Sequence, residues 1–150
     1  MSIPATVTDI HEGAFAIKSL EAITVATENP CFASKDGVLF DKSLQTLIAY
    51  PRSKPDAQYT IPSGLRVIGD KAFTETPVRS VSIPRGVGDI GEYAFAHTKL
   101  AEVSIPSSVS KIGTHAFAFC TQLISVELFR ITKVHREAFI ASPVRLRYRD

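Results

Sequence analysis

The chain has 150 residues, of which 45% are hydrophobic and 21% charged, with a formal net charge of +2 at pH 7. This length suits one domain with a buried core, and the small charge gives no sign of nucleic-acid binding or of attraction to a membrane surface. No apolar run approaches the ~18 residues of a membrane span, and the stretch from Met1 to Val7 lacks the basic start and apolar segment of a signal peptide.

The first predicted element spans residues 3–25, and it contains a pattern that the chain repeats. Its Ala-Phe pair ends at Phe15, and the same pair ends at four later phenylalanines 22 residues apart, Phe73, Phe95, Phe117 and Phe139. The gap of 58 residues between Phe15 and Phe73 equals 22 plus 36. Self-similarity at a fixed period of about 20–50 residues is typical of stacked repeats.

Apolar residues keep fixed offsets around each of these phenylalanines. Five positions before them stand Ile10, Ile68, Ile90, Ile112 and Val134, and eight positions before them stand Val7, Leu65, Val87, Val109 and Ile131. The apolar triplets that follow them are Leu20/Ile23/Val25, Val78/Val81/Ile83, Leu100/Val103/Ile105 and Leu123/Val126/Leu128. We therefore expect one solenoid domain over residues 1–150, made of about five to six coils.

Each unit predicts one coil with a strand and a return segment. The triplet spacing L-x-x-V-x-I places apolar side chains inward on a short parallel strand, and the proline after Ile61, Ile83 and Ile105 ends the pairing because it has no N–H. The apolar spacing of the return segment also suits a helix, but a glycine such as Gly113 disfavours one. The pattern favours an extended piece, a glycine turn and one helical turn at Ala-Phe; a full helix is the alternative. Because each coil is covered only by its neighbours, the Phe column is the expected spine of the core.

The second predicted element is an enlarged coil that contains an insertion over residues 26–55. Its pattern predicts a β-hairpin in which residues 38–41 pair with residues 47–50 across a polar connection, residues 42–46. Phe32, Phe40 and Tyr50 lie in this coil, outside the repeat pattern, and are candidate contact residues for a partner. The alternative is that the hairpin only covers the edge of a sheet.

The later units predict a flat outer strand face of small and charged residues. Thr24, Thr60, Ser82 and Ser104 form a column of hydroxyls on it. Because the face carries no aromatic residue, stacking of bases or sugars is not expected there. Its candidate contact residues for a protein partner are Arg79, Glu102 and Glu127. A flat face of this kind also suits self-association, so a homo-oligomer is possible.

The two ends of the predicted solenoid differ. The chain starts at Ile3-Pro4, the last part of a strand, without a polar cap, which predicts a sticky edge and either a longer protein or a partner that covers this end. At the other end, Val144, Leu146 and Tyr148 are expected to face inward, while Arg145, Arg147 and Arg149 face outward. The arginines either prevent further strand pairing or contact an acidic partner.

No pattern of catalytic or metal-binding residues is visible. The sequence has no phosphate-binding loop, dinucleotide-binding fingerprint, zinc-protease motif or serine-hydrolase elbow. His11 and His135 belong to the first and last units and are too far apart to share a metal, and Cys31 and Cys120 are isolated thiols, Cys120 expected to be buried. We expect no enzyme, no cofactor and no metal.

One unit, residues 105–120 (IPSSVSKIGTHAFAFC), resembles the BspA-like, or treponemal-type, leucine-rich repeat. The segments 29–42 (NPCFASKDGVLFDK) and 47–51 (LIAYP) are similar to the enlarged coil of that family. The resemblance covers nearly the whole chain. It implies a right-handed leucine-rich-repeat solenoid of the kind found in bacterial or protist surface proteins, some of which adhere to host matrix proteins or to other cells. It brings no catalytic residues.

Two hypotheses of function follow. The first is a non-catalytic protein-binding or adhesion module of a secreted or surface protein, and its main support is the resemblance. The second is a structural scaffold that self-associates through its N-terminal edge or its strand face.

Overall fold

The computed structural model describes residues 1–11 and 13–150, and the regular elements in them are all strands. In chain order these are β1 (Ser2–Ile3), β2 (Thr24–Val25), β3 (Phe32–Lys35), β4 (Val38–Asp41), β5 (Thr46–Ala49), β6 (Gln58–Thr60), β7 (Val67–Ile68), β8 (Ser80–Ser82), β9 (Asp89–Ile90), β10 (Glu102–Ser104), β11 (Lys111–Ile112), β12 (Ser125–Phe129), β13 (Lys133–Val134) and β14 (Arg145–Arg149).

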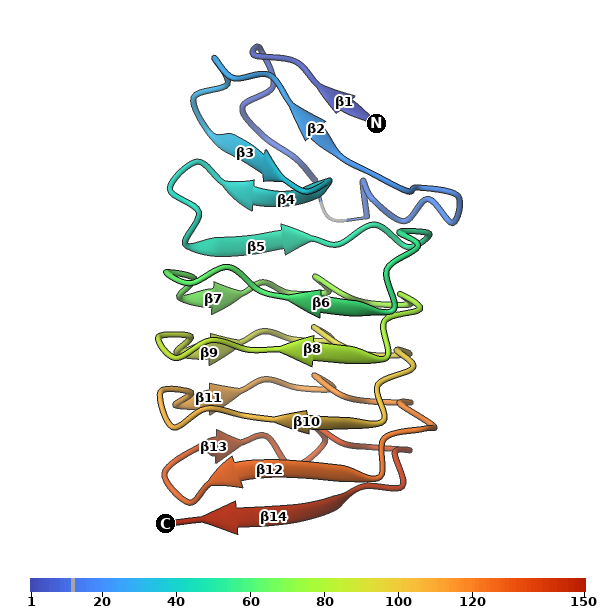
Figure 1. The fold of residues 1–150 in the computed structure, drawn as a ribbon, viewed down its shortest axis with the longest axis vertical. Coiled ribbons are helices and arrows are strands. Elements are labelled where there is room, and N and C mark those ends of the chain that lie inside the picture. The colour runs from blue at the N-terminus through green and yellow to red at the C-terminus, as the bar shows by residue number, and fades with distance from the viewer. Residues whose placement is uncertain (12) are drawn as a thin grey trace.

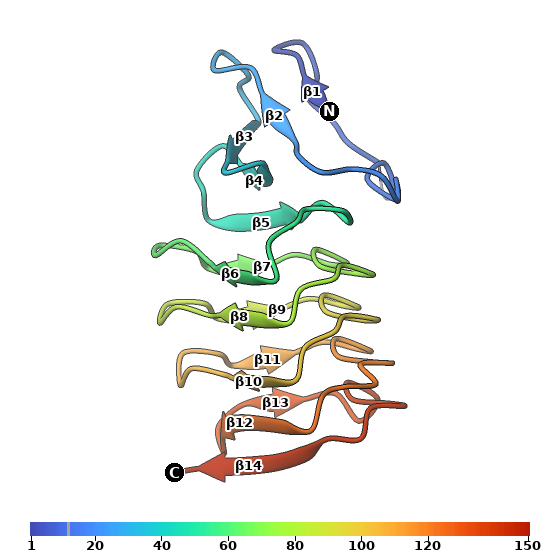
Figure 2. The same ribbon diagram turned by 45° about the vertical axis from the view of Figure 1, so that its right-hand side comes forward.

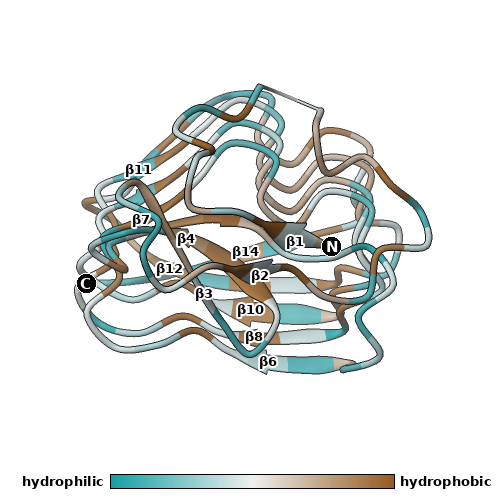
Figure 3. Cartoon of the chain, turned by 90° about the horizontal axis from the view of Figure 1, so that it is seen from above, coloured by the Kyte–Doolittle hydropathy of each residue, from teal (hydrophilic) through white to brown (hydrophobic). Residues whose placement is uncertain are grey.

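The strands stack into two ladders on opposite sides of the solenoid (Figure 1). The front ladder contains the triplet strands, paired in parallel as β1-β2, β6-β8 and β10-β12-β14. The return ladder is a seven-stranded sheet in the order β13-β11-β9-β7-β5-β4-β3. Seen from above, successive coils lie over one another (Figure 3), so the predicted solenoid is confirmed.

The predicted core fills the space between the two ladders. The inward residues of the triplets are buried, apart from the half-buried Val25, and so are Phe73, Phe95 and Phe117. Their rings stack face to face: the centroids of Phe73 and Phe95 are 4.8 Å apart, those of Phe95 and Phe117 5.0 Å, and those of Phe117 and Phe139 5.2 Å. The Phe column is therefore the spine of the core, as predicted.

The helical turn expected at each Ala-Phe pair is wrong, and so is the alternative of a full helix. The Phe73 N–H donates to the Ala94 carbonyl of the next coil at 2.7 Å, while the Thr74 N–H donates to the Lys71 carbonyl of its own coil at 3.1 Å. Two residues with left-handed backbone, Lys71 with φ 57° and Glu75 with φ 59°, lie on either side of this turn. A helix bonds each N–H to the carbonyl four residues back and leaves none for the neighbouring coil. Pairing between coils therefore excludes the helix.

The enlarged coil contains the predicted hairpin and one further strand. β4 pairs antiparallel with β5, as expected, and β3 also pairs antiparallel with β4. The turn between β3 and β4 has φ 51° at Asp36 and φ 77° at Gly37, the conformation that an Asp-Gly pair favours in a tight hairpin. β3 and β4 lie between β2 and β5, and β1 and β2 tilt away from the rest of the stack (Figures 1 and 2).

β4 divides the core of the solenoid in two. Its first three residues, Val38, Leu39 and Phe40, are completely buried, and because side chains alternate along a strand, Leu39 faces the opposite way from Val38 and Phe40. Val38 and Phe40 pack into the large cluster that holds the Phe stack. Leu39 packs into a smaller cluster with Ile3, Leu20 and Ile23 of the first coil. The insertion is thus a wall between the first coil and the others.

Two placements in the last coil differ from the prediction. Ile131 was expected to face inward but is 72% exposed, and Thr132 is buried instead, where its hydroxyl donates to the Val109 carbonyl at 2.9 Å. The cause is a shift by one residue, since Val126 pairs with Val103, 23 positions earlier rather than 22. Tyr148, also expected inward, is 49% exposed, whereas Leu146 packs against the core.

Candidate functional site

The outer strand face is a row of exposed side chains held in register by the front ladder. Of the predicted contact residues, Arg79 and Glu102 are exposed and Glu127 is half-exposed. Glu102 and Glu127 line one shallow groove of about 320 Å³ with Ser80 and Arg147. A second groove, of about 470 Å³, lies beside it and includes Ser82, Ser104, Arg85 and Arg149. The structure therefore brings Glu102 and Glu127 together and leaves Arg79 outside both grooves.

Charges alternate across the C-terminal part of this face. The parallel register places Glu127 beside Arg147, and the Arg149 side chain forms an ion pair with Glu127. Arg145 and Arg147 are exposed on the same strand. Ion pairs of this kind at the surface contribute little to stability.

The aromatic residues of the enlarged coil are not a contact surface, which corrects the expectation for two of them. Phe40 and Tyr50 are buried, and only Phe32 is partly exposed. Tyr50 stacks on Phe73 at 5.0 Å, and its N–H donates to the Ala72 carbonyl as those of the repeat phenylalanines do in their coils. Tyr50 therefore occupies the Phe position of the enlarged coil. Burial raises its pKa to about 12, and burial also raises the pKa of Tyr59, whose ring packs on it at 5.0 Å.

Two columns of side chains flank the Phe stack on the return side, and sequence reasoning missed both. The first contains residues two positions before each Phe: the Lys71 amine lies 5.9 Å from the Tyr93 ring centroid, and Tyr93 stacks on His115 at 4.7 Å. His115 Nε2 is in turn 3.5 Å from a carboxylate oxygen of Glu137. The shared offset from the Phe positions was the signal that could have revealed the column.

The second column lies two positions after each Phe. A nitrogen of Arg52 is 2.7 Å from a carboxylate oxygen of Glu75, and His97 stacks on Phe119 at 4.7 Å in the next coil. The histidines of both columns thus serve as flat surfaces for packing between coils.

The cysteines and the potential metal ligands of the described residues form no assembled site. No group of three or more His, Cys, Asp or Glu in residues 1–11 and 13–150 could hold a metal ion. Both cysteines are free thiols, and burial raises the pKa of Cys120, so its thiol stays protonated and inert. Within the same residues, no helix has the length and hydrophobicity to cross a membrane.

Known proteins with the same repeats identify the family. Residues 52–147, more than half of the chain, match the BspA type leucine rich repeat region with 6 copies. A leucine-rich repeat protein from Eubacterium ventriosum shares 31% identity and a TM-score of 0.82, over 89% of this chain and 36% of that one. No curated protein matches the sequence.

Two further solved structures share the fold at lower identity. A leucine rich cell surface protein from Faecalibacterium prausnitzii is 23% identical, with a TM-score of 0.72 over 100% of this chain and 48% of that one. The pneumococcal vaccine antigen PcpA is also 23% identical, with a TM-score of 0.70 over 99% and 45%. The chain thus spans between about a third and a half of these three proteins. With repeats, stacked ladders and family match in agreement, the chain belongs to the BspA-type leucine-rich-repeat family.

Proposed function

We propose that this chain is a non-catalytic protein-binding module of a secreted or cell-surface protein, and that it adheres to its partner through the outer strand face. The observation that carries the proposal is the patterned charge on a rigid face: Glu102, Glu127 and Arg147 line a groove whose backbone is fixed by the ladder beneath it. Preorganised polar groups lose little conformational entropy on binding.

Two other features support this proposal. Arg79 adds an exposed guanidinium, a group enriched at protein interfaces, on a neighbouring strand end, and Phe32 adds a partly exposed ring on β3. A solved relative of the same fold is described as a cell surface protein. No aromatic residue is among the described residues that line the groove of Glu102 and Glu127, which disfavours the stacking of bases there, and the described residues hold no cluster of metal ligands.

Adhesion can be tested by measuring binding of the purified chain to a panel of immobilised extracellular-matrix proteins by surface plasmon resonance. The double variant Glu102→Lys/Glu127→Lys should abolish any binding that the wild type shows. The matched control is Asp89→Lys/Glu92→Lys, which reverses two exposed acidic residues on the return side. Equal loss in both double variants would show nonspecific charge effects and contradict a role for the strand face.

A self-associating scaffold is the second candidate, and one observation favours it. An apolar hollow of about 320 Å³ lies at the β1 end of the stack, lined by Met1, Ile3, Val7, Ile10 and Phe15 among others. Exposed apolar surface beside a strand edge promotes association. Sedimentation across a concentration series tests it: concentration-dependent dimers that vanish when a polar capping repeat is fused ahead of Met1 support a scaffold, and a monomer throughout contradicts it.

A further inference from the structure

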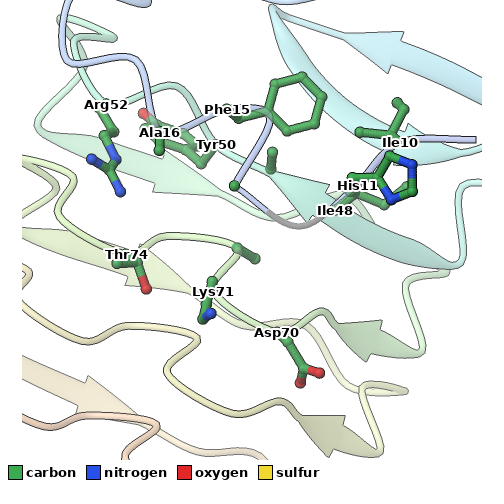
Figure 4. Close-up of a pocket in the computed structure, with 13 residues that line it drawn as sticks. Ile10, His11, Phe15, Ala16, Ile48, Tyr50, Arg52, Asp70, Lys71 and Thr74 are labelled. Carbon is green, nitrogen blue, oxygen red and sulfur yellow. The ribbon is translucent and has the colours of Figure 1, made fainter.

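A small cavity lies where the first coil meets the enlarged coil on the return side (Figure 4). Its volume is about 170 Å³. Ile10 and Phe15 of the first coil and Ile48 and Tyr50 of the enlarged coil form apolar walls, and Arg52 lies at one end of it. The cavity is separate from the strand face, and the inference drawn from it does not rest on the proposed function.

The cavity marks a break in the aromatic stack. Rings follow one another at 4.8–5.2 Å from Tyr50 through Phe73, Phe95 and Phe117 to Phe139. No ring contact joins Phe15 to Tyr50 in the described residues, and Phe15 packs into the cluster of the first coil instead. The wall of β3 and β4 tilts the first coil away, so the ring that would continue the column is missing at this point (Figure 2).

The size and lining of the cavity suit one six-membered ring. A protein cavity of about 150 Å³ with apolar walls takes up benzene. Here a ring would lie against Ile10, Phe15 and Ile48, which keep part of their surface exposed, while Tyr50 is 3% exposed and closes the floor of the cavity.

The rim of the cavity offers a cation to a ligand. Arg52 is 18% exposed and uses one guanidinium nitrogen for its contact with Glu75 at 2.7 Å. A guanidinium has five N–H donors, so others remain for a carboxylate. The nearest acid in the lining, Asp70, is turned to the next coil, where one of its oxygens accepts the Glu92 N–H at 2.8 Å. Arg52 therefore favours an anionic group beside the ring.

We propose that this cavity binds an aromatic ring that carries a carboxylate close by, with the ring against Phe15 and Ile48 and the carboxylate on Arg52. Two sources share this chemistry: a free arylalkanoate, and the C-terminal Phe or Tyr of a peptide.

Phenylacetate is the first probe, with binding followed by NMR on methyl-labelled isoleucines. The methyl signals of Ile10 and Ile48 should shift on titration, and benzyl alcohol should bind about tenfold more weakly because it lacks the charge that pairs with Arg52. Acetate, which lacks the ring, should leave both methyl signals unchanged. If phenylacetate moves neither signal, or moves isoleucines throughout the chain equally, the proposal is wrong.

Variants locate the site. Ala16 is an exposed residue in the lining, so Ala16→Leu should fill the cavity without unfolding the protein and should abolish binding, while Ala101→Leu on the strand face should leave it intact. Arg52→Gln should weaken phenylacetate about tenfold and benzyl alcohol little, with Arg85→Gln as its matched control. Binding that survives in Ala16→Leu would place the ligand elsewhere and overturn the proposal.

Binding of peptides distinguishes the two sources of the ligand, a free arylalkanoate and the C-terminus of a peptide. A short peptide that ends in Phe should bind more tightly than phenylacetate if a chain terminus is the natural ligand, and its C-terminal amide should bind about tenfold more weakly. Equal or weaker binding of the peptide assigns the site to free arylalkanoates.

Discussion

Each central phenylalanine of the return side is enclosed by rings from the coils on both sides. Phe95 is fully buried and stacks at 4.8 Å on Phe73 and at 5.0 Å on Phe117. Removing a ring leaves a cavity that rigid ladders cannot close, so Phe95→Ala and Phe117→Ala should each lower the free energy of unfolding by about 3–5 kcal/mol in urea denaturation. Phe119→Ala, at a ring that is 43% exposed, is the control and should cost less than about 1 kcal/mol. Similar losses at both kinds of site would contradict the ring stack as the spine.

Asn29 connects the first coil to the enlarged coil with a fully satisfied side chain. It is buried, and its amide group donates to the carbonyls of Pro4 and Val7, both at 2.9 Å. Its oxygen accepts the N–H groups of Cys31 at 2.9 Å and Phe32 at 2.8 Å. Asn29→Ala leaves these groups without their partner, and we expect a loss of about 2–4 kcal/mol in the unfolding free energy. A thermal midpoint equal to that of the wild type would contradict this role.

Tyr50 makes the fold sensitive to alkali. Burial raises its pKa from 10.0 to about 12, so the folded chain holds the phenol proton more tightly than the unfolded chain does. The resulting stability is complete below about pH 10 and is lost as the pH rises towards 12. Urea denaturation at a series of pH values should show this loss in the wild type and a smaller one in Tyr50→Phe. At neutral pH the two should be equally stable, since the hydrogen bond that the hydroxyl makes within the described residues is long, 3.4 Å to the Asp56 carbonyl.

At the level of elements, the strands and core positions that recur in every repeat can be predicted from the sequence. The predictions fail where the spacing between repeats changes. The triplet strands and the Phe column were predictable because the same offsets recur at a period of 22 residues. The β3–β4 turn was missed although Asp36-Gly37 is a strong hairpin signal. Tyr50 was predicted to lie outside the repeat pattern. The pair Ala49-Tyr50 stands 23 residues before Phe73, however, and Tyr50 takes the Phe position in the enlarged coil. The return turn was misassigned because apolar spacing fits a helix but cannot show which N–H groups pair between coils.

The hairpin is expected to be structural, which is the alternative to partner contact that the sequence left open. Replacing residues 31–44 by a short Gly-Ser linker removes the wall, including Leu39 and Phe40, and leaves Leu20 and Ile23 of the first coil without cover. Limited proteolysis should then cut within residues 1–29, while circular dichroism shows that strands survive. Leu44→Gly is the control, because this exposed residue has φ 58° and glycine adopts that conformation without strain. A first coil as resistant as in the wild type would show that the hairpin is not needed for docking.

Across the whole molecule, the two unequal clusters imply that the solenoid opens from its N-terminal end. Stability in a stack of coils is close to a sum of contacts between neighbours, and the first coil contributes three buried residues to the smaller cluster, Ile3, Leu20 and Ile23, with Val7, Ile10, Phe15 and Val25 partly buried beside them. Amides that hold it, such as Thr24 N and Ala26 N, should therefore exchange with deuterium faster than Phe95 N and Phe117 N, which donate between central coils at 2.7 and 2.8 Å. Native-state hydrogen exchange measures both sets.

Variants should separate the local opening of the first coil from global unfolding. Asn29→Ala should accelerate exchange at Thr24 and Ala26 and leave the central amides unchanged, because the hydrogen bonds that it breaks lie within the enlarged coil and between that coil and the first one. Phe95→Ala should accelerate the central amides, whose exchange requires the stack to open. If Asn29→Ala accelerated all four amides equally, the chain would unfold as one cooperative unit. The first coil would then not open independently of the other coils, although β4 divides the hydrophobic core.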